Sequence, residues 1–414
     1  MARRVVVTGV GAVTPLGRTV GETWASVLAS RSAVAPITRF DPEGFPVRFA
    51  AQAEDPPDPG PWLDARGHAA LEPETRTRKG RLTVAALREA IEQARFDRTG
   101  PRVAVCLGSE AARPELTELA ARMHAGSLPG VAELMGMAPA APTRLVAALV
   151  GATGPQSTTS TACTSSSQAV GEALLRIRRG EVDAAIAGGV DVLVDPIMVT
   201  GFARLGALST RNEAPQRASR PFDRDRDGFV LGEGAGMLVL EALETAVARG
   251  APILGELSGF GCSCNAWRIT DSPPDGRGAM QAMQAALRDA ALQPEDIGYI
   301  NAHGTSTPMN DVSETSGIHR AFGDRVGRAV PVSSTKSMMG HLVAACGAVE
   351  AILCLQACRE GILPPGINLD NPDPGCDLNH VGGVPQEAPV RHALTNAFGF
   401  GGSNGSLILS AWEG

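Results

Sequence analysis

Short hydrophobic runs alternate along the chain with segments of helical periodicity. The apolar runs are punctuated by glycine and predict strands buried on both faces. They lie at residues 5–8, 103–107, 184–187, 237–241, 299–301 and 407–409. Helical patterns occupy residues 82–94, 168–179, 280–291, 311–322 and 344–359. Strands that alternate with helices predict an α/β architecture with layered sheets.

Composition adds a large core and excludes some classes of protein. Of the 414 residues, 43% are hydrophobic and 20% are charged, which is typical of a folded globular chain. No Gly/Ser-rich or Pro-rich linker interrupts the pattern, so we expect two closely packed halves, residues 1–250 and 251–414. The net charge of −7 argues against a nucleic-acid partner.

Targeting signals and cysteine spacing point to an intracellular protein. The first residues lack the long apolar region of a signal peptide, and no stretch of about 18 apolar residues could span a membrane. The eight cysteines show neither zinc-site pairs nor a disulfide framework. We therefore expect a cytoplasmic protein without membrane association, in which most cysteines are buried thiols.

Two motifs are discounted. The aspartates at 223, 225 and 227 copy the start of a calcium-binding loop, but Gly234 occupies its twelfth position. The Gly9-Val-Gly11 turn resembles a dinucleotide loop, but Thr14 replaces its third glycine. Neither calcium nor a nucleotide is expected.

Cys163 is the first candidate for chemistry. It follows a β-branched stretch and precedes the helical pattern at 168–179, so it is expected at a helix N-terminus. Unpaired N–H groups and the helix dipole favour an anion there, which predicts a lowered thiol pKa and a reactive thiolate. The small neighbours Ala162, Ser165 and Ser166 are expected to leave room for a substrate. The alternative is a structural cysteine.

Two histidines and a lysine follow in glycine-rich turns. His303 ends a predicted strand, where it can poise a proton or donate to a developing oxyanion. Lys336 and His341 lie five residues apart in a turn that can aim both inward. Lys336 is expected to act as a fixed charge that sets the protonation state of the site. The alternatives are a turn histidine and an exposed lysine.

Taken together, these segments resemble the elongating ketoacyl synthases, the condensing enzymes of fatty acid and polyketide assembly. The resemblance covers nearly the whole chain and rests on six motifs, at residues 4–17, 161–165, 221–236, 301–307, 334–341 and 396–402. It implies the thiolase-like fold, five α-β-α-β-α layers built from two similar halves, and a dimer. Starter-unit condensing enzymes differ because they pair cysteine with histidine and asparagine.

The resemblance also implies roles for the candidates. Cys163 would take an acyl chain from an acyl carrier protein as a thioester, and His303 and His341 would bind the malonyl thioester and assist its decarboxylation. The carbanion would then attack the acyl group to give a 3-oxoacyl product. Lys336 would support the histidines electrostatically.

Further positions follow from the same resemblance. Phe398 and Phe400 match the family's gate residues. The backbone N–H groups of Phe400 and Cys163 would form an oxyanion hole. Thr305 and Thr307 would bind the phosphopantetheine arm of the carrier protein, with no other cofactor required. A structural monovalent cation is implied at Asn301, Glu314, Glu350 and Asn396, and a Glu314–Lys336 ion pair is the alternative use of that carboxylate.

Other readings stay open. Glu110 departs from the small or apolar residue usual near the acyl pocket, and residues 308–315 resemble ketosynthase subunits of bacterial aromatic or polyene polyketide systems. The chain could thus form a homodimer or a heterodimer with a chain-length factor. A non-condensing chain-length subunit would lack the cysteine, and a coenzyme A-dependent thiolase would be expected to keep a second cysteine near the C-terminus.

Overall fold

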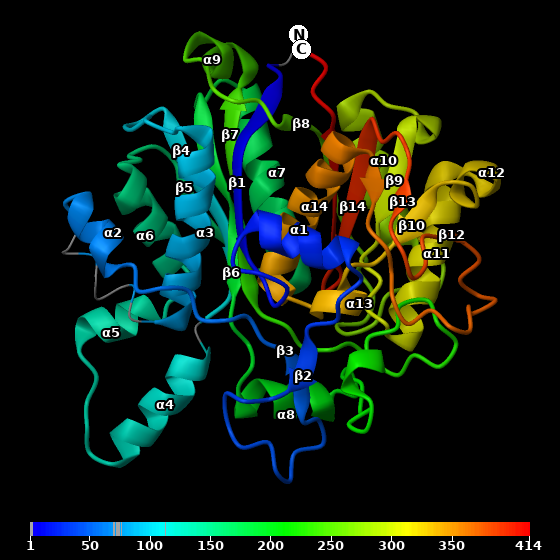
Figure 1. Ribbon diagram of the computed structural model, residues 1–414, viewed down its shortest axis with the longest axis horizontal. Coiled ribbons are helices and arrows are strands. Elements are labelled where there is room, and N and C mark those ends of the chain that lie inside the picture. The colour runs from blue at the N-terminus through cyan, green and yellow to red at the C-terminus, as the bar shows by residue number, and fades with distance from the viewer. Residues whose placement is uncertain (1–2, 69–70, 72–74, 76, 112) are drawn as a thin grey trace.

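Eleven strands form one continuous mixed sheet in the computed structural model, which describes residues 3–68, 71, 75, 77–111 and 113–414 (Figure 1). One part comprises β1 (Val5–Val13), β4 (Val103–Ser109), β5 (Gln156–Thr159), β6 (Ala184–Asp191) and β7 (Gly234–Ala242). The other comprises β8 (Gly255–Cys264), β9 (Ile297–Asn301), β10 (Pro331–Ser333), β12 (Asn379–His380), β14 (His392–Phe398) and β15 (Ser403–Ser410). The strand order is β12-β10-β9-β14-β15-β8-β1-β7-β6-β4-β5.

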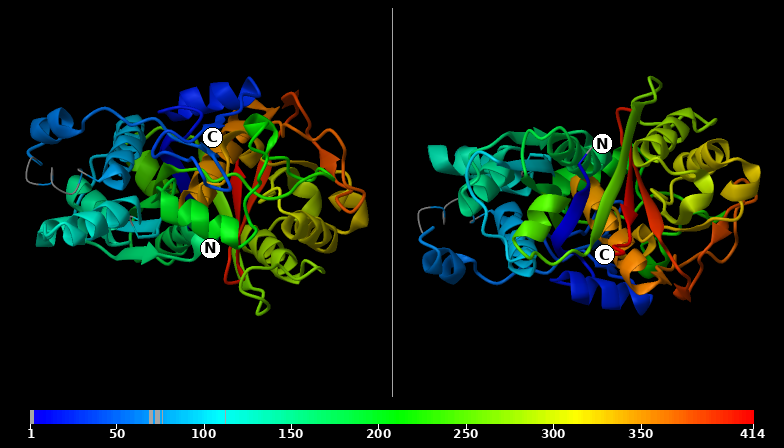
Figure 2. Two further views of the ribbon diagram at one scale, coloured as in Figure 1. Left: turned by 90° about the horizontal axis from the view of Figure 1, so that it is seen from below. Right: turned by 90° about the horizontal axis from the view of Figure 1, so that it is seen from above.

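The two parts meet only where β1 pairs with β8. Val6 lies opposite Glu256 and Val7 opposite Gly255, whereas β1 pairs with β7 along nearly its whole length. Figure 2 shows most of the N-terminal part, in cool colours, on one side of the molecule and the C-terminal part, in warm colours, on the other. The division into domains at residue 250 stays a prediction.

Helices α7 (Ser165–Arg178) and α14 (Cys346–Glu360) lie between the two parts of the sheet (Figure 1). Residues 346–358 of α14 are all buried, which explains why its sequence is apolar on every face. Helices α3 (Arg78–Ala94) and α6 (Ala141–Val150) cover the outer face of the first part. Helices α10 (Arg277–Ala290) and α11 (Pro308–Phe322) cover the second. The result is the five-layered arrangement that the resemblance implies.

Smaller elements complete the fold. Two short sheets pair β2 (Val34–Pro36) with β3 (Phe49–Ala51) and β11 (Ile362–Leu363) with β13 (Gln386–Glu387). The remaining helices are α1 (Val20–Leu28), α2 (Gly60–Ala65), α4 (Arg113–His124), α5 (Val131–Gly136), α8 (Pro196–Arg204), α9 (Leu243–Ala248), α12 (Asp324–Gly327) and α13 (Lys336–Met339). Helices α4 and α5 project from the body at the lower left of Figure 1.

Each predicted strand and helix is present, with longer bounds in most cases. The sequence patterns missed β5 and β14, whose polar residues interrupt the apolar runs. None of the described helices combines the length and apolarity needed to cross a membrane.

Candidate active site

Cys163 lies in a 3-10 turn, Ala162–Thr164, directly before α7. Ala162 adopts a φ of 51°, in the left-handed region that residues other than glycine rarely occupy. Such backbone strain is typical of functional turns. The cysteine is 6% exposed, at the inner end of a cavity.

The loop after β14 approaches this turn closely at Gly399. A Cβ atom there would lie 2.9 Å from the carbonyl oxygen of Thr161 and 3.4 Å from the amide nitrogen of Cys163. Only glycine allows this approach without a shift of the backbone. The contact brings the next residue, Phe400, beside the nucleophile.

Burial raises the pKa of Cys163 to about 12, although interactions with the backbone N–H groups of Phe400 and Cys163 and the charge of Lys336 act to lower it. This direction is opposite to the lowered pKa expected from the helix start. The physical reason is that excluding water destabilises the thiolate more than the two N–H groups and Lys336 stabilise it. The resting form is therefore the thiol.

His341 faces the sulfur directly. Its Nε2 lies 3.0 Å from Sγ of Cys163, and the backbone N–H of Val343 donates to its Nδ1 at 3.2 Å. Burial and the charge of Lys336 hold the pKa of His341 well below its usual range, so the ring is neutral. Because Nδ1 accepts a hydrogen bond, the single proton of the neutral ring is on Nε2, facing the sulfur.

His303 is positioned by a carboxylate behind its own backbone. Oε1 of Glu314 accepts the N–H of His303 at 2.9 Å, and Oε2 accepts that of Gly304 at 2.7 Å. Asn396 donates to the same carboxylate at 3.1 Å. Burial, the charge of Lys336 and the neighbouring His341 ring, which disfavours a second protonated imidazole beside it, hold the pKa of His303 well below its usual range.

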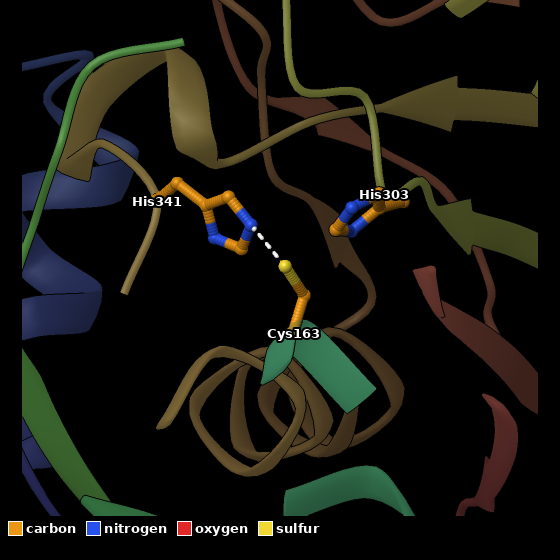
Figure 3. Close-up of side chains that lie close together, drawn as sticks. All are labelled: Cys163, His303 and His341. Carbon is orange, nitrogen blue, oxygen red and sulfur yellow. Dashed lines mark hydrogen bonds between the residues drawn. The ribbon is translucent and has the colours of Figure 1, made fainter. Parts of the chain in front are cut away.

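The three side chains converge on one point, as Figure 3 shows. One ligand-type atom each of Cys163, His303 and His341 lie within 4.8 Å of one another. The two rings meet edge to face, with centroids 5.2 Å apart. The structure thus brings together a thiol and two neutral imidazoles, all buried, from separate parts of the chain.

Lys336 is buried beside the cluster and forms an ion pair with Glu350 of α14. The alternative pairing with Glu314 is wrong, because that carboxylate accepts the backbone N–H groups of the His303 loop. Burial is the largest effect and acts to lower the pKa of Lys336, but the charge of Glu350, its hydrogen bond, and the charges of Cys346 and Glu314 together raise the pKa. The lysine therefore keeps its positive charge near the imidazoles.

A cavity of about 300 Å³ opens onto the cluster. Thr305 and Thr307 line it, and their hydroxyl oxygens lie 3.0 Å apart. Thr307 also accepts the N–H of Asn310 at 3.4 Å and so caps the start of α11. At least one of the two threonines therefore has a structural role as well.

Phe398 and Phe400 are both at this cavity. The Phe398 ring packs edge to face on His303, with centroids 5.6 Å apart. Phe400 is half-buried and lies between this cavity and a second one, which it also lines. Gly401, which follows it, has a φ of +85°.

Two of the small neighbours of Cys163 do not face the substrate cavity. Ser166 accepts the N–H of Ala348 from α14 at 3.0 Å, and Ser165 donates to the carbonyl of Ala162 at 2.7 Å. Both serines are fully buried. They are small because the central helices pack closely, and Ala162 alone of the three lines the cavity.

Glu110 is a site residue whose contacts sequence reasoning could not assign. Its Oε1 accepts the N–H of Ala162 at 3.1 Å, and its Oε2 accepts the hydroxyl of Ser160 at 2.8 Å. The sequence indicated only that Glu110 is charged at a position where ketoacyl synthases usually have a small or apolar residue. The carboxylate lines the second cavity.

The residues expected at a cation site are buried, and two of their oxygens lack hydrogen-bond partners among the described residues. These are Oδ1 of Asn301 and Oε2 of Glu350. Burial raises the pKa values of Glu314 and Glu350 to about 7. A donor set of carboxylate and amide oxygens with unpaired positions fits a hard monovalent cation.

Comparison with known proteins gives the chain a family. Residues 2–246 match the beta-ketoacyl synthase N-terminal domain, and residues 254–370 match the C-terminal domain. The 3-oxoacyl-[acyl-carrier-protein] synthase 2 of Synechocystis sp. is 42% identical over 421 residues, with 99% of each chain covered. That of Coxiella burnetii is 41% identical over 424 residues, with 99% of this chain and 98% of the relative covered.

Solved structures agree. A beta-ketoacyl synthase from Burkholderia phymatum superposes with a TM-score of 0.90 at 36% identity, covering 99% of this chain and 100% of that one. The ishigamide ketosynthase/chain length factor gives 0.89 at 35% identity, and a type II polyketide ketosynthase in complex with its acyl-carrier protein gives 0.89 at 31%, each with full coverage of both chains. The chain therefore belongs to the beta-ketoacyl synthase family, the acyltransferase-type condensing enzymes with the thiolase-like fold.

Proposed function

We propose that this enzyme joins an acyl group held on Cys163 to malonyl-acyl carrier protein, releasing carbon dioxide and giving a 3-oxoacyl-acyl carrier protein. The main support for these roles is that Cys163, His303 and His341 converge and all line one cavity. In the first half-reaction the sulfur of Cys163 bonds to the acyl carbonyl carbon and the thioester bond to the carrier breaks. The thiol proton passes to the departing pantetheine sulfur.

The two imidazoles act in the second half-reaction. Loss of carbon dioxide leaves an enolate, whose oxygen needs hydrogen-bond donors already in place. The N–H of Val343 fixes the proton of His341 on Nε2, and the low pKa values keep both rings neutral. His303 and His341 then donate to the enolate oxygen, and the enolate carbon bonds to the acyl-Cys163 carbonyl carbon. The bond between that carbon and the sulfur breaks, and the Cys163 thiolate takes a proton from solvent to regain the thiol.

The backbone N–H groups of Cys163 and Phe400 serve the other carbonyl. Both N–H groups interact with the Cys163 sulfur, and the tetrahedral intermediate on the acyl group would form beside that sulfur. Preorganised amides of this kind are typically worth 10² to 10³ in rate each. Lys336, held by Glu350, keeps the imidazoles neutral, and Glu314 positions the loop of His303.

The carrier supplies the remaining chemistry. Thr305 and Thr307 line the same cavity as the cluster, and we assign them to the phosphopantetheine arm. Asn301, Glu314, Glu350 and Asn396 would hold a monovalent cation that offsets the two buried carboxylates. We place the enzyme in the cytoplasm.

A dimer is part of the proposal. Strand β5 lies at the end of the sheet order, with β4 on one side only. In the same part of the chain, α4, α5 and their connection expose five large apolar side chains: Met123, Leu128, Val131, Leu134 and Met135. An open strand edge and exposed apolar surface each favour pairing with a second chain. Sedimentation of the native chain and a Thr158→Pro variant tests this, and a monomeric native chain would count against a homodimer.

A heterodimer with a chain-length factor is the second candidate. Solved neighbours include the ishigamide ketosynthase/chain length factor and a ketosynthase in complex with its chain length factor from Xenorhabdus doucetiae. In such a pair this chain would be the condensing subunit, because it keeps Cys163 and both histidines. A monomer that gains activity only with a homologous partner would favour this alternative.

Intact-mass measurement tests the roles directly. The native chain and the Cys163→Ala and His303→Ala variants are incubated with acyl-acyl carrier protein and then with malonyl-acyl carrier protein. We expect an acyl adduct on the native chain and on His303→Ala, none on Cys163→Ala, and no condensation product from either variant. An adduct that persists on Cys163→Ala would overturn the assignment.

A further inference from the structure

Glu110 presents a carboxylate to the second cavity, beside the nucleophile. That cavity has a volume of about 540 Å³ and is lined largely by apolar and small residues. Ala162, Phe202, Val343 and Phe400 line both cavities, so the two adjoin where Phe400 separates them. An acyl chain that extends from Cys163 past Phe400 enters the space that Glu110 lines.

The carboxylate is fixed in place. Ala162 N–H and Ser160 Oγ donate to its two oxygens, and Ser165 Oγ lies 3.5 Å from Oε1. The backbone of Glu110 is held as well, since the buried Lys79 donates to its carbonyl at 2.5 Å. Nζ of Lys79 lies in turn 3.4 Å from Oδ1 of Asp191. The charged group therefore cannot easily swing out of the cavity wall.

A carboxylate in this position distinguishes between acyl groups. Methylene groups packed against it exclude water without replacing its hydrogen bonds, which is unfavourable. An acyl chain with a hydroxyl group can donate to the carboxylate and compensate for the lost water. Sites built to bind a polar group reject analogues that lack it.

We infer that Glu110 is a specificity-determining residue, and that it selects acyl chains that carry a hydrogen-bond donor over saturated chains of the same length. The inference rests on the proposed acyl transfer to Cys163 and names the class of acyl group that this transfer accepts. The step itself is unchanged: the Cys163 sulfur–acyl bond forms, the pantetheine sulfur–acyl bond breaks, and the thiol proton ends on pantetheine.

The experiment measures acylation of Cys163 by dodecanoyl-pantetheine and by dodecanoyl-pantetheines hydroxylated at carbon 3, 5 or 7. Intact mass follows the adduct, and kcat/KM follows release of the pantetheine thiol. For the native chain we expect at least one hydroxylated chain to react about tenfold faster than the saturated one. In Glu110→Ile that preference should fall about tenfold or reverse.

Two further variants separate specificity from simple positioning of the turn. Glu110→Gln keeps an acceptor oxygen for the N–H of Ala162 but removes the charge, and Glu213→Gln removes an exposed carboxylate outside both cavities. Equal slowing of all substrates in Glu110→Ile and Glu110→Gln, with an unchanged ratio, would assign Glu110 to positioning alone and overturn the inference. No adduct with any substrate on the native chain would instead refute the proposed acyl transfer.

Discussion

Nε2 of His341 lies 3.0 Å from Sγ of Cys163, while its Nδ1 accepts the N–H of Val343. This pair of contacts fixes both the position and the tautomer of the imidazole. The ring is therefore a hydrogen-bond donor toward the reaction centre and is not set up as a base for the thiol. We therefore propose that its contribution belongs to decarboxylation rather than to acyl transfer.

His341→Ala should therefore separate the two half-reactions. We expect acylation of Cys163 to persist, while release of carbon dioxide from malonyl-acyl carrier protein falls by about 10² to 10³, the typical loss of one oxyanion donor. Single-turnover mass spectrometry measures the first and trapped labelled carbon dioxide the second. If both rates fell equally, His341 would instead serve the thiol.

Lys336 is predicted to set the protonation state of both imidazoles. Burial comes first among the causes that lower their pKa values, and the lysine charge adds to it. A lowered pKa means that the rings stay neutral as the pH falls through the usual histidine range, about 6.5. In Lys336→Met both pKa values should rise, whereas Lys336→Arg should keep them low.

Nitrogen-15 spectra of labelled histidine test this between pH 8 and pH 5.5. Signals of His303 and His341, assigned with His303→Asn and His341→Asn variants, should stay constant in the native chain and shift at a higher pH in Lys336→Met than in Lys336→Arg. Identical titration in all three chains would show that burial alone sets the pKa values.

The Lys336–Glu350 pair should be costly to break from one side. Both side chains are buried, so Glu350→Ala leaves an uncompensated charge and is expected to destabilise the fold by about 3 to 5 kcal/mol. The double variant Lys336→Met, Glu350→Leu removes both charges and should regain much of that stability without regaining activity. Urea unfolding measures the free energy, and a double variant no more stable than Glu350→Ala would contradict the account.

Gly399→Ala tests the close approach of the loop after β14 to the turn that holds Cys163. The added methyl group would meet the carbonyl oxygen of Thr161 at 2.9 Å, so the loop must shift. We expect about 1 to 3 kcal/mol of destabilisation and slower acylation of Cys163, because the Phe400 amide moves with the loop. Gly382→Ala, with open space around its Cβ position and, like Gly399, no positive φ, is the control for replacing a glycine. Equal acylation rates in the two variants would argue against the oxyanion role of Phe400.

The sequence by itself determined most of the local elements and pointed to the candidate reactive groups. Apolar runs bounded by glycine located most of the strands, because residues buried on both faces leave a continuous apolar signature. The motifs around Cys163, His303, Lys336 and His341 likewise carried the family resemblance. These signals are local, since each depends on residues within a few positions of one another.

Tertiary structure decided what depends on residues far apart in the chain. Whether Lys336 pairs with Glu314 or Glu350 follows from the packing of α13 against α14, and the contact of Glu110 with the turn of Cys163 joins positions 52 residues apart. The pKa of Cys163 was misjudged for the same reason. The helix start is a local feature that lowers it, but burial depends on the whole fold and has the larger effect.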